Sequence, residues 1–235
     1  EHRAQQPAVQ VDRQLQQFLH REVRISCHRR SRLEKISRFA AARAGGKIEA
    51  HAIVAASRIY TPDYIVSWLL QNTLGALWLA MHPGSTMRAR WPLLVESAVG
   101  PAREPRPLSQ LTLLDPCCGC GAFLVAAFDM LLALAQDERR LAQAGAIPAD
   151  WPSRDPARTV VERCLWGADL DREAVQIVRR ELRTRSGCDP GDHLWVAQLP
   201  LGTLDPDAVD RRFDVVCTNP PYIGFRQLDA AIRDA

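Results

Sequence analysis

The stretch "QLTLLDPCCGCGAFL", residues 110–124, predicts the beginning of an α/β fold. An apolar run ends at Asp115, two glycines follow at Gly119 and Gly121, and a second apolar run then begins. A short buried strand over 110–115, a tight turn and a helix over 122–136 account for this order. Glycine permits the positive φ angles that such a turn needs and lets the backbone approach a ligand closely.

Three further apolar runs of strand length follow this unit. They are "RCLWGAD" (163–169), "HLWVAQ" (193–198) and "FDVVCT" (213–218), and a helical pattern over 172–185 separates the first two. Strands that alternate with helices form βαβ units, so we expect a parallel sheet. Upstream, we expect a helix that starts at Thr61, with Pro62 at its first helical position, and a loop over 82–107.

Composition and charge indicate a folded core and a separate basic segment. The 235 residues are 47% hydrophobic, which is enough for a sizeable core. Between Glu1 and Arg58 there are 12 Lys and Arg against 5 Asp and Glu, which fits either a polyanionic partner or a solvated helical face. We therefore expect two parts, a basic helical extension over 1–57, with its helix over 8–44, and an α/β domain over 58–235.

The number and spacing of the cysteines indicate a reducing compartment, and the lengths of the apolar runs bear on whether the chain spans a membrane. An odd number of cysteines, three of them in "CCGC", favours reduced thiols and a cytoplasmic protein over a disulfide framework. Three thiolates in "CCGC" could bind zinc, but the spacing is unlike that of a zinc site, so we expect no metal. The longest apolar run, "AFLVAAFDMLLALA", is broken by Asp129, so we expect no membrane span.

Unusual residues stand at the carboxyl end of each predicted strand, where open parallel sheets bind their ligands. Strand one ends at Asp115, strand two at Asp169, strand three at Gln198 and strand four at Asn219. A glycine turn with a carboxylate at the next strand end describes a nucleoside site without a pyrophosphate, and S-adenosylmethionine is such a ligand. The alternative is a tight strand-to-helix turn without a ligand.

The fourth strand runs into "NPPY", residues 219–222. Consecutive prolines cannot continue a sheet ladder. The Asn219 side-chain oxygen and the Pro220 carbonyl can both accept hydrogen bonds from one exocyclic amine, which makes the nitrogen lone pair available. Tyr222 offers a face on which a base can stack, worth about 1–3 kcal/mol. The alternative is a proline-rich turn that caps the strand.

Four segments together resemble the adenine-specific (N6) DNA methyltransferases of the gamma order. "LLDPCCGCGAFL" (113–124) resembles their S-adenosylmethionine motif, and "NPPY" resembles their catalytic motif. "RIYTPDYIVSWLLQNTLGALW" (58–78) is similar to their upstream helix, and "CLWGADLDREA" (164–174) is similar to their ribose-binding segment. The amino-acid sequences of these segments most resemble those of the large methyltransferases of BREX phage-defence systems and of fused restriction–modification proteins.

The resemblance implies a truncated Rossmann-like methyltransferase fold that uses S-adenosylmethionine. It implies direct methyl transfer to a flipped adenine of double-stranded DNA, with other defence-system subunits as further partners and no cysteine nucleophile at Cys117 or Cys120. The implied cofactor-binding residues are Thr61, Pro62, Asp115, Pro116, Cys117, Gly119, Gly121, Phe123, Asp169, Leu170 and Gln198. The implied catalytic residues are Asn219, Pro220, Pro221 and Tyr222.

This sequence departs from the family pattern in two ways. Gln198 stands where the family has an acidic residue, and the chain ends at Ala235. We therefore expect an N-terminal portion that lacks the C-terminal strands and the target-recognition domain. Two alternatives stay open: a protein glutamine N5-methyltransferase, since an amide nitrogen needs the same two acceptors, and an inactive S-adenosylmethionine-binding fragment.

Overall fold

The structure, a computed structural model, describes residues 61–197 and 212–220. All of these residues fall in one compact unit. The predicted helix over 8–44 and the boundary between 1–57 and 58–235 lie outside the described residues and stay predictions.

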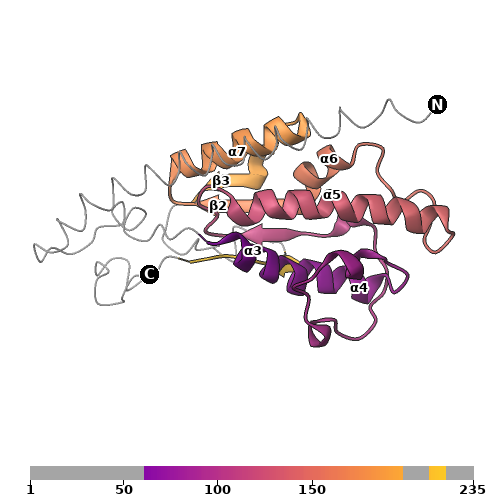
Figure 1. Cartoon of the computed structure of the whole chain (residues 1–235). Helices are drawn as coiled ribbons and strands as arrows, with labels where there is room; N and C mark the ends of the chain where they lie inside the picture. The colour runs from indigo at the N-terminus through magenta and orange to yellow at the C-terminus, as the bar shows by residue number, and fades with distance from the viewer. Residues whose placement is uncertain (1–60, 198–211, 221–235) are drawn as a thin grey trace, which may run out of the picture. The chain divides into compact units, whose positions relative to one another are not determined.

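Four parallel strands form one sheet in the order β3-β2-β1-β4 (Figure 1). Leu113 of β1 pairs with Leu165 of β2 on one side and with Val215 of β4 on the other. The predicted α/β class and the parallel sheet are confirmed. The strands are β1 (Leu113–Asp115), β2 (Leu165–Asp169), β3 (Leu194–Val196) and β4 (Val215–Val216).

The strands are shorter than predicted because helical turns take up the residues before two of them. A 3-10 turn, η4 (Leu108–Gln110), comes shortly before β1, and a π turn, η5 (Val160–Cys164), runs directly into β2. The apolar side chains in these turns join the same core as the strands, so hydrophobicity alone did not separate turn from strand.

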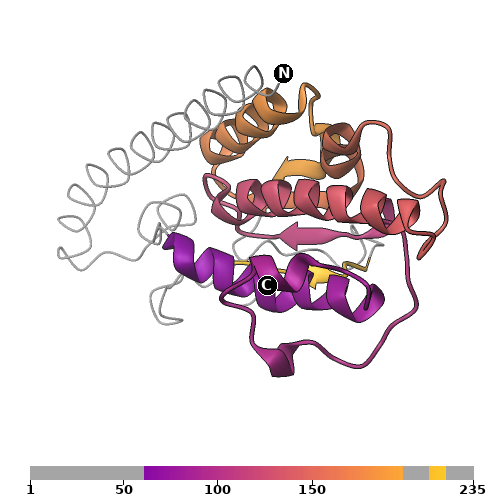
Figure 2. The ribbon, with the colours of Figure 1, turned by 45° about the vertical axis from the view of Figure 1, so that its right-hand side comes forward.

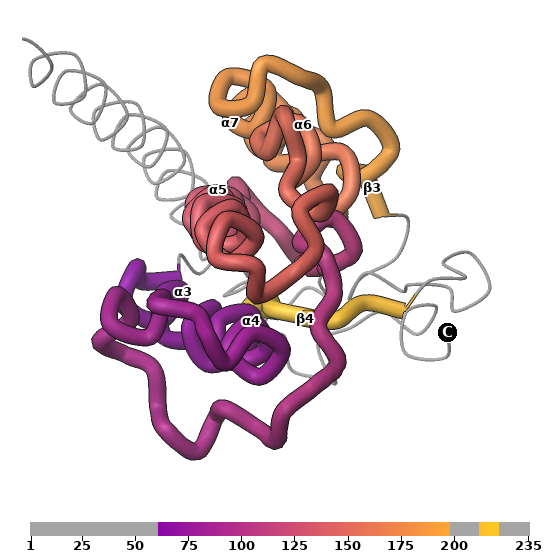
Figure 3. Tube along the Cα trace, turned by 90° about the vertical axis from the view of Figure 1, so that its right-hand side faces the viewer, coloured from indigo at the N-terminus to yellow at the C-terminus, as the bar shows by residue number. Residues whose placement is uncertain are grey.

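Three helices lie along one face of the sheet: α3 (Asp63–Leu70), α5 (Ala122–Gln143) and α7 (Arg172–Ser186) (Figure 3). Gly167 of β2 lets α5 come close, because a Cβ atom at this position would lie 2.5 Å from Cδ1 of Leu124 and 3.0 Å from Cδ2 of Leu194. Helix α7 is capped at its N-terminus by Asp171, whose side chain accepts a hydrogen bond from the backbone N–H of Glu173.

Helix α5 continues to Gln143, so its predicted end at residue 136 is wrong. Its charged residues 137 and 138 are buried and satisfied by partners far along the chain. Asp137 accepts hydrogen bonds from Nε1 of Trp78 (3.0 Å) and Oγ of Ser85 (2.6 Å). Glu138 accepts from the backbone N–H of Leu108 (2.7 Å). These contacts bind the last turns of α5 to the segment before β1.

The upstream helix begins later than predicted. Pro62 has ψ 145° and stands before the helix, so α3 begins at Asp63, and Thr61 is not its cap. The helix then passes through a π turn, η1 (Gln71–Gly75), into α4 (Ala76–Met81). Gly75 is the last residue of this π turn, and a Cβ atom there would lie 2.9 Å from Cε of Met130.

The segment between α4 and β1 is a long loop with short 3-10 turns, as predicted (Figure 2). The side chains of Gln71 and Asn72 hold it, through hydrogen bonds with the backbone of Leu93 and Val95 at 2.7–2.8 Å. The turns are η2 (Met87–Arg90), η3 (Glu96–Ala98) and η4, and a short helix, α6 (Pro156–Thr159), precedes η5.

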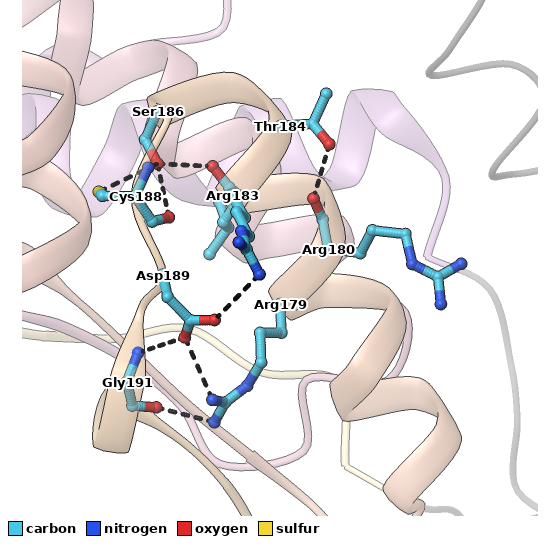
Figure 4. Close-up of polar contacts among 9 residues, drawn as sticks. Arg179, Arg180, Arg183, Thr184, Ser186, Cys188, Asp189 and Gly191 are labelled. Carbon is cyan, nitrogen blue, oxygen red and sulfur yellow. Dashed lines mark hydrogen bonds and ion pairs between the residues drawn. The ribbon is translucent and has the colours of Figure 1, made fainter.

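Arg179 of α7 joins this helix to the segment before β3 (Figure 4). Its guanidinium donates to the carbonyl oxygens of Gly191 and Leu194, both at 2.8 Å, and pairs with Asp189 at 3.2 Å. The helix ends at Gly187, which adopts a left-handed conformation (φ 74°), and the 3-10 turn η6 (Gly191–His193) leads into β3. This arrangement fixes where β3 begins.

Five of the cysteines in residues 61–197 and 212–220 are free thiols. Cys117, Cys118, Cys164, Cys188 and Cys217 are free, which agrees with the expected reduced state. Cys120 is disulfide-bonded, so this residue departs from the expected reduced state.

Candidate functional site

The candidate site lies at the carboxyl edge of the sheet. Asp115 ends β1, Asp169 ends β2, and Asn219 follows β4 by three residues. Because these strands are parallel neighbours, their carboxyl ends share one edge. The structure therefore brings together residues that are separated by more than 100 positions in the sequence.

Two backbone N–H groups hold the glycine turn against the end of β2. The N–H of Cys118 donates to the carbonyl oxygen of Ala168 (2.8 Å), and the N–H of Gly119 donates to Oδ2 of Asp169 (2.7 Å). Gly119 and Gly121 have φ angles of 51° and 85°, the positive values that the sequence predicted.

The surroundings of these two glycines differ. A Cβ atom at Gly121 would lie 2.8 Å from Cγ2 of Val178, so this glycine permits the packing of α7 against the turn. A Cβ atom at Gly119 would have no atom of the described residues within 4 Å. The backbone at Gly119 therefore faces open space, which fits a ligand that approaches the turn closely.

The Asp169 carboxylate is fixed by the backbone on both of its oxygens. Oδ2 accepts from Gly119, and Oδ1 accepts from the N–H of Asp171 at 2.8 Å. Each carboxylate oxygen can accept more than one hydrogen bond, so these contacts are compatible with a hydroxyl ligand at the same group. The geometry fits the cofactor that the sequence implied, with the carboxylate held beside the open side of Gly119.

Asp115 is a buried carboxyl group in the centre of the site. Its pKa is raised from 3.8 to about 7, chiefly by burial and also by the negative charge of Asp169, while the Thr218 hydroxyl and the backbone N–H of Cys117 oppose the shift. The N–H of Cys117 lies 3.2 Å from Oδ1 of Asp115. Near neutral pH this carboxyl therefore exists in both protonation states.

The thiol of Cys117 stays protonated at neutral pH. Burial, together with the negative charges of Asp115 and Asp169, raises its pKa to about 11. A thiol with such a pKa has very little of the thiolate form that acts as a nucleophile. This agrees with the expectation that Cys117 is not a nucleophile.

Asn219 forms a hydrogen bond with Thr61, which lies two residues before the first residue of the upstream helix α3. Its Nδ2 donates a hydrogen bond of 2.9 Å to Oγ1 of Thr61, across 158 positions of sequence. A second contact lies nearby, where Oγ1 of Thr73 and Sγ of Cys217 are 3.4 Å apart. Cys217 in turn donates its backbone N–H to the carbonyl oxygen of Leu114 (3.0 Å), so the upstream helix, β4 and β1 are tied together.

The predicted site residues fall into three groups. Seven are joined at the carboxyl edge by the contacts above or belong to its glycine turn: Thr61, Asp115, Cys117, Gly119, Gly121, Asp169 and Asn219. Phe123 is buried in the hydrophobic core, while Pro116 and Leu170 are half-buried and Pro62 and Pro220 are exposed. Gln198, Pro221 and Tyr222 lie outside the described residues.

Sequence reasoning missed Thr218 and Thr73. The Thr218 side chain lowers the pKa of Asp115 and Cys117, although its buried oxygen is not within full hydrogen-bond geometry of a partner among the described residues. Its position directly before Asn219 was visible in the sequence, but its role depends on β4 lying next to β1. Nothing in the sequence distinguishes Thr73 from the other residues of the predicted upstream helix, so its contact with Cys217 could not be predicted.

Residues 61–197 and 212–220 contain no group of three or more His, Cys, Asp or Glu side chains placed to hold a metal ion. Within the same ranges, every helix is too short or too polar to cross a bilayer.

Comparison with known families adds to this geometry. The family described as an RMKL-like methyltransferase domain matches residues 105–227, which include the glycine turn, Asp169 and the "NPPY" segment. This match covers slightly more than half of the chain.

Three curated relatives match about half of the chain. The adenine-specific methyltransferase BrxX of Escherichia coli O9:H4 (strain HS) is 27% identical over 143 residues, which is 57% of this chain and 11% of BrxX. The adenine-specific methyltransferase PglX of Lacticaseibacillus casei (strain Zhang) is 31% identical over 140 residues, 53% of this chain and 11% of PglX. A Synechocystis sp. protein named "Putative RNA methyltransferase" is 29% identical over 126 residues, 48% of this chain and 30% of that protein. The matched region is thus a small part of each relative.

Proposed function

Because the chain belongs to the family of RMKL-like methyltransferase domains, we propose that it methylates the N6 amino group of adenine in double-stranded DNA. The methyl donor in this proposal is S-adenosylmethionine. The two relatives named as adenine-specific methyltransferases support the choice of adenine. A phage-defence or restriction–modification system in the cytoplasm, with further subunits as partners, is the setting that the sequence resemblance favours.

One observation carries the proposal. The glycine turn with Asp169 and the acceptor residue Asn219 share one edge of the sheet, and the buried Asp115 ends β1, the strand that pairs with both β2 and β4. This arrangement supports the proposal of a donor cradle beside an acceptor site for an amine. Methyl transfer requires this arrangement, because the reacting atoms must be held within about 3–3.5 Å of each other.

The donor side is assigned to the glycine turn and its neighbours. Gly119 provides the open backbone, Asp169 would accept hydrogen bonds from the ribose hydroxyls, and Leu170 would lie against the adenine ring. Thr61 and Pro62 stand at the methionine end, Asp115, Pro116, Cys117 and Gly121 shape the turn, and Phe123 supports it from the core. Gln198 is assigned to the adenine edge. When bound, S-adenosylmethionine supplies a methyl group that is activated by a sulfonium.

The acceptor side is assigned to Asn219, Pro220, Pro221 and Tyr222. The oxygen of the Asn219 side chain and the carbonyl of Pro220 accept the two hydrogens of the target amine, which draws the nitrogen lone pair away from the ring. The proline rings hold that carbonyl in a fixed direction. Tyr222 stacks on the extruded base and offsets part of the few kcal/mol that base flipping costs.

A second candidate substrate is RNA. The relative from Synechocystis is named for RNA, and two hydrogen-bond acceptors suit any exocyclic amine on a nucleobase. The basic segment between Glu1 and Arg58 suits either polyanion.

Labelled S-adenosylmethionine offered with unmethylated duplex DNA, with RNA and with protein separates these functions. We expect label in DNA and its loss with Asn219→Ala. Label in RNA alone favours the second candidate, label in protein favours glutamine methylation, and cofactor binding without transfer to any substrate favours the inactive fragment.

A further inference from the structure

The contact between Thr61 and Asn219 determines which way the asparagine amide points. An asparagine side chain has a donor end, Nδ2, and an acceptor end, Oδ1. In the structure, the donor end faces Oγ1 of Thr61 at 2.9 Å. The acceptor end therefore faces away from Thr61. With the amide turned by 180°, the NH2 group would replace the oxygen there, and a second donor would face any amine in the site.

Thr61 is well placed to hold this orientation. It is buried, with 8% of its surface exposed, and the next residue, Pro62, accepts backbone hydrogen bonds from Ile65 (3.0 Å) and Val66 (3.1 Å). The backbone beside Thr61 is thus anchored to the first turn of α3. The contact of Thr73 with Cys217 at 3.4 Å holds the same helical segment against the end of β4.

The Thr61 hydroxyl is not used for the task that a threonine usually has before a helix. Serine and threonine at this place commonly cap the first turn by accepting from a backbone N–H. In the described part of the chain, no side chain caps α3 in this way, and the Thr61 oxygen instead accepts from a residue 158 positions away. Local helix stability does not account for a hydroxyl at this position.

We propose that Thr61 is a positioning residue that fixes the Asn219 amide with its oxygen toward the target amine. This inference rests on the proposed function, because it assigns Thr61 a part in amine methylation. The hydroxyl acts only through Asn219 in this role and does not touch the target. While it accepts from Asn219, the Thr61 hydroxyl can still donate its own proton. A carboxylate at the methionine end of the cofactor can accept this proton, which strengthens the hydroxyl oxygen as an acceptor for Asn219.

Kinetic measurements on three variants test the proposal. Thr61→Val keeps the shape and removes the hydroxyl, and Thr61→Ser keeps the hydroxyl. With duplex DNA as substrate, we expect Thr61→Val to lower kcat about tenfold, the effect of about one hydrogen bond, and Thr61→Ser to restore kcat to within about twofold of the wild type. Thr184→Val is the matched control, because the Thr184 hydroxyl bonds only its own helix at Arg180 (2.9 Å) among the described residues, and kcat should not change.

A double-mutant cycle separates positioning from a purely structural role. Asn219→Ala is assayed in single turnover with excess enzyme, where a small residual rate can be measured. If Thr61 acts through Asn219, adding Thr61→Val should not lower this residual rate further. An equal loss of kcat in both backgrounds would overturn the proposal. A rise in KM for S-adenosylmethionine with unchanged kcat would also overturn it, since Thr61 would then serve cofactor binding alone.

A measurement without turnover keeps this inference distinct from the proposed function. The side-chain amide signals of Asn219 in the ¹⁵N-labelled chain are identified by their loss in Asn219→Ala. We expect their exchange with solvent to be at least severalfold faster in Thr61→Val and near wild type in Thr61→Ser. Slow exchange in Thr61→Val would overturn the inference. Absence of DNA methylation by the wild-type chain would overturn the proposed function but leave the amide result to decide the hydrogen bond.

Discussion

The backbone N–H of Gly119 donates a 2.7 Å hydrogen bond to the carboxylate of Asp169, which lies 50 residues further along the chain. This bond closes the glycine turn of β1 onto the end of β2. It explains why the turn keeps a fixed shape although Gly119 itself makes no close side-chain contact within the described residues. The same carboxylate is the group to which we assign the ribose, so the shape of the turn and the binding of the cofactor depend on one side chain.

Replacing each glycine of the turn by alanine should separate cofactor binding from stability. Gly119→Ala places a methyl group in open space at φ 51°, so we expect a loss of stability of about 1 kcal/mol and at least a tenfold loss of S-adenosylmethionine affinity. Gly121→Ala combines φ 85° with a Cβ atom 2.8 Å from Val178, so it should destabilise the fold by about 2–4 kcal/mol. Urea unfolding and calorimetric titration measure the two effects. Equal effects of both changes on stability and on affinity would contradict the distinction.

Asp169→Asn should weaken both the turn and the cofactor site. One end of the asparagine amide is a donor, and it must face either the N–H of Gly119 or that of Asp171. We expect a loss of about 1–3 kcal/mol in unfolding free energy and weaker binding of S-adenosylmethionine. Asp155→Asn is the control, because Asp155 caps α6 and asparagine caps a helix equally well. Unchanged affinity in Asp169→Asn would remove this residue from the cofactor site.

Asp115 should make the domain less stable as the pH rises. Its pKa is about 7 in the folded chain against 3.8 unfolded, so between these pH values the unfolded state loses this proton first. The stability that the proton contributes is complete below pH 4 and is lost as pH rises to about 7, a change of about 4 kcal/mol. Unfolding free energies of the wild type and Asp115→Asn, compared at pH 5 and pH 8, test this. The difference between the two proteins should move in favour of the variant at pH 8, and a constant difference would contradict the account.

Asp137 should behave in the opposite way. Burial alone raises its pKa, but hydrogen bonds from Ser85, Trp78 and Arg140 outweigh burial and lower it. Its contribution to stability is therefore present above its unfolded pKa and is lost in acid. We expect Asp137→Asn to destabilise the chain by about 1–3 kcal/mol at pH 7 in thermal or urea unfolding. Asp129→Asn on the exposed side of the same helix should change stability by less than about 1 kcal/mol. A similar loss in both variants would contradict the assigned role.

The sequence predicted the features that depend on nearby residues. The strand, glycine turn and helix around Asp115 follow from local hydrophobicity and from the conformational freedom of glycine. The gathering of Asp115, Asp169 and Asn219 at one edge follows from the parallel sheet, because parallel strands end on the same side.

Features that depend on distant partners could not be predicted. The end of α5 was misplaced because Asp137 and Glu138 read as exposed charges, whereas their partners Trp78 and Leu108 lie 59 and 30 residues earlier. Thr61 was assigned as a helix cap and a cofactor residue, and its bond to Asn219 became visible only when the strand order placed β4 next to β1.

Mass spectrometry of DNA nucleosides tests the central claim most directly. Unmethylated duplex DNA is incubated with the chain and S-adenosylmethionine, digested, and analysed for methylated nucleosides, with Asn219→Ala in parallel. The account predicts N6-methyldeoxyadenosine with the wild type and its loss with the variant. A wild-type chain that binds the cofactor but leaves every deoxyadenosine unmodified, or a variant as active as the wild type, would contradict it.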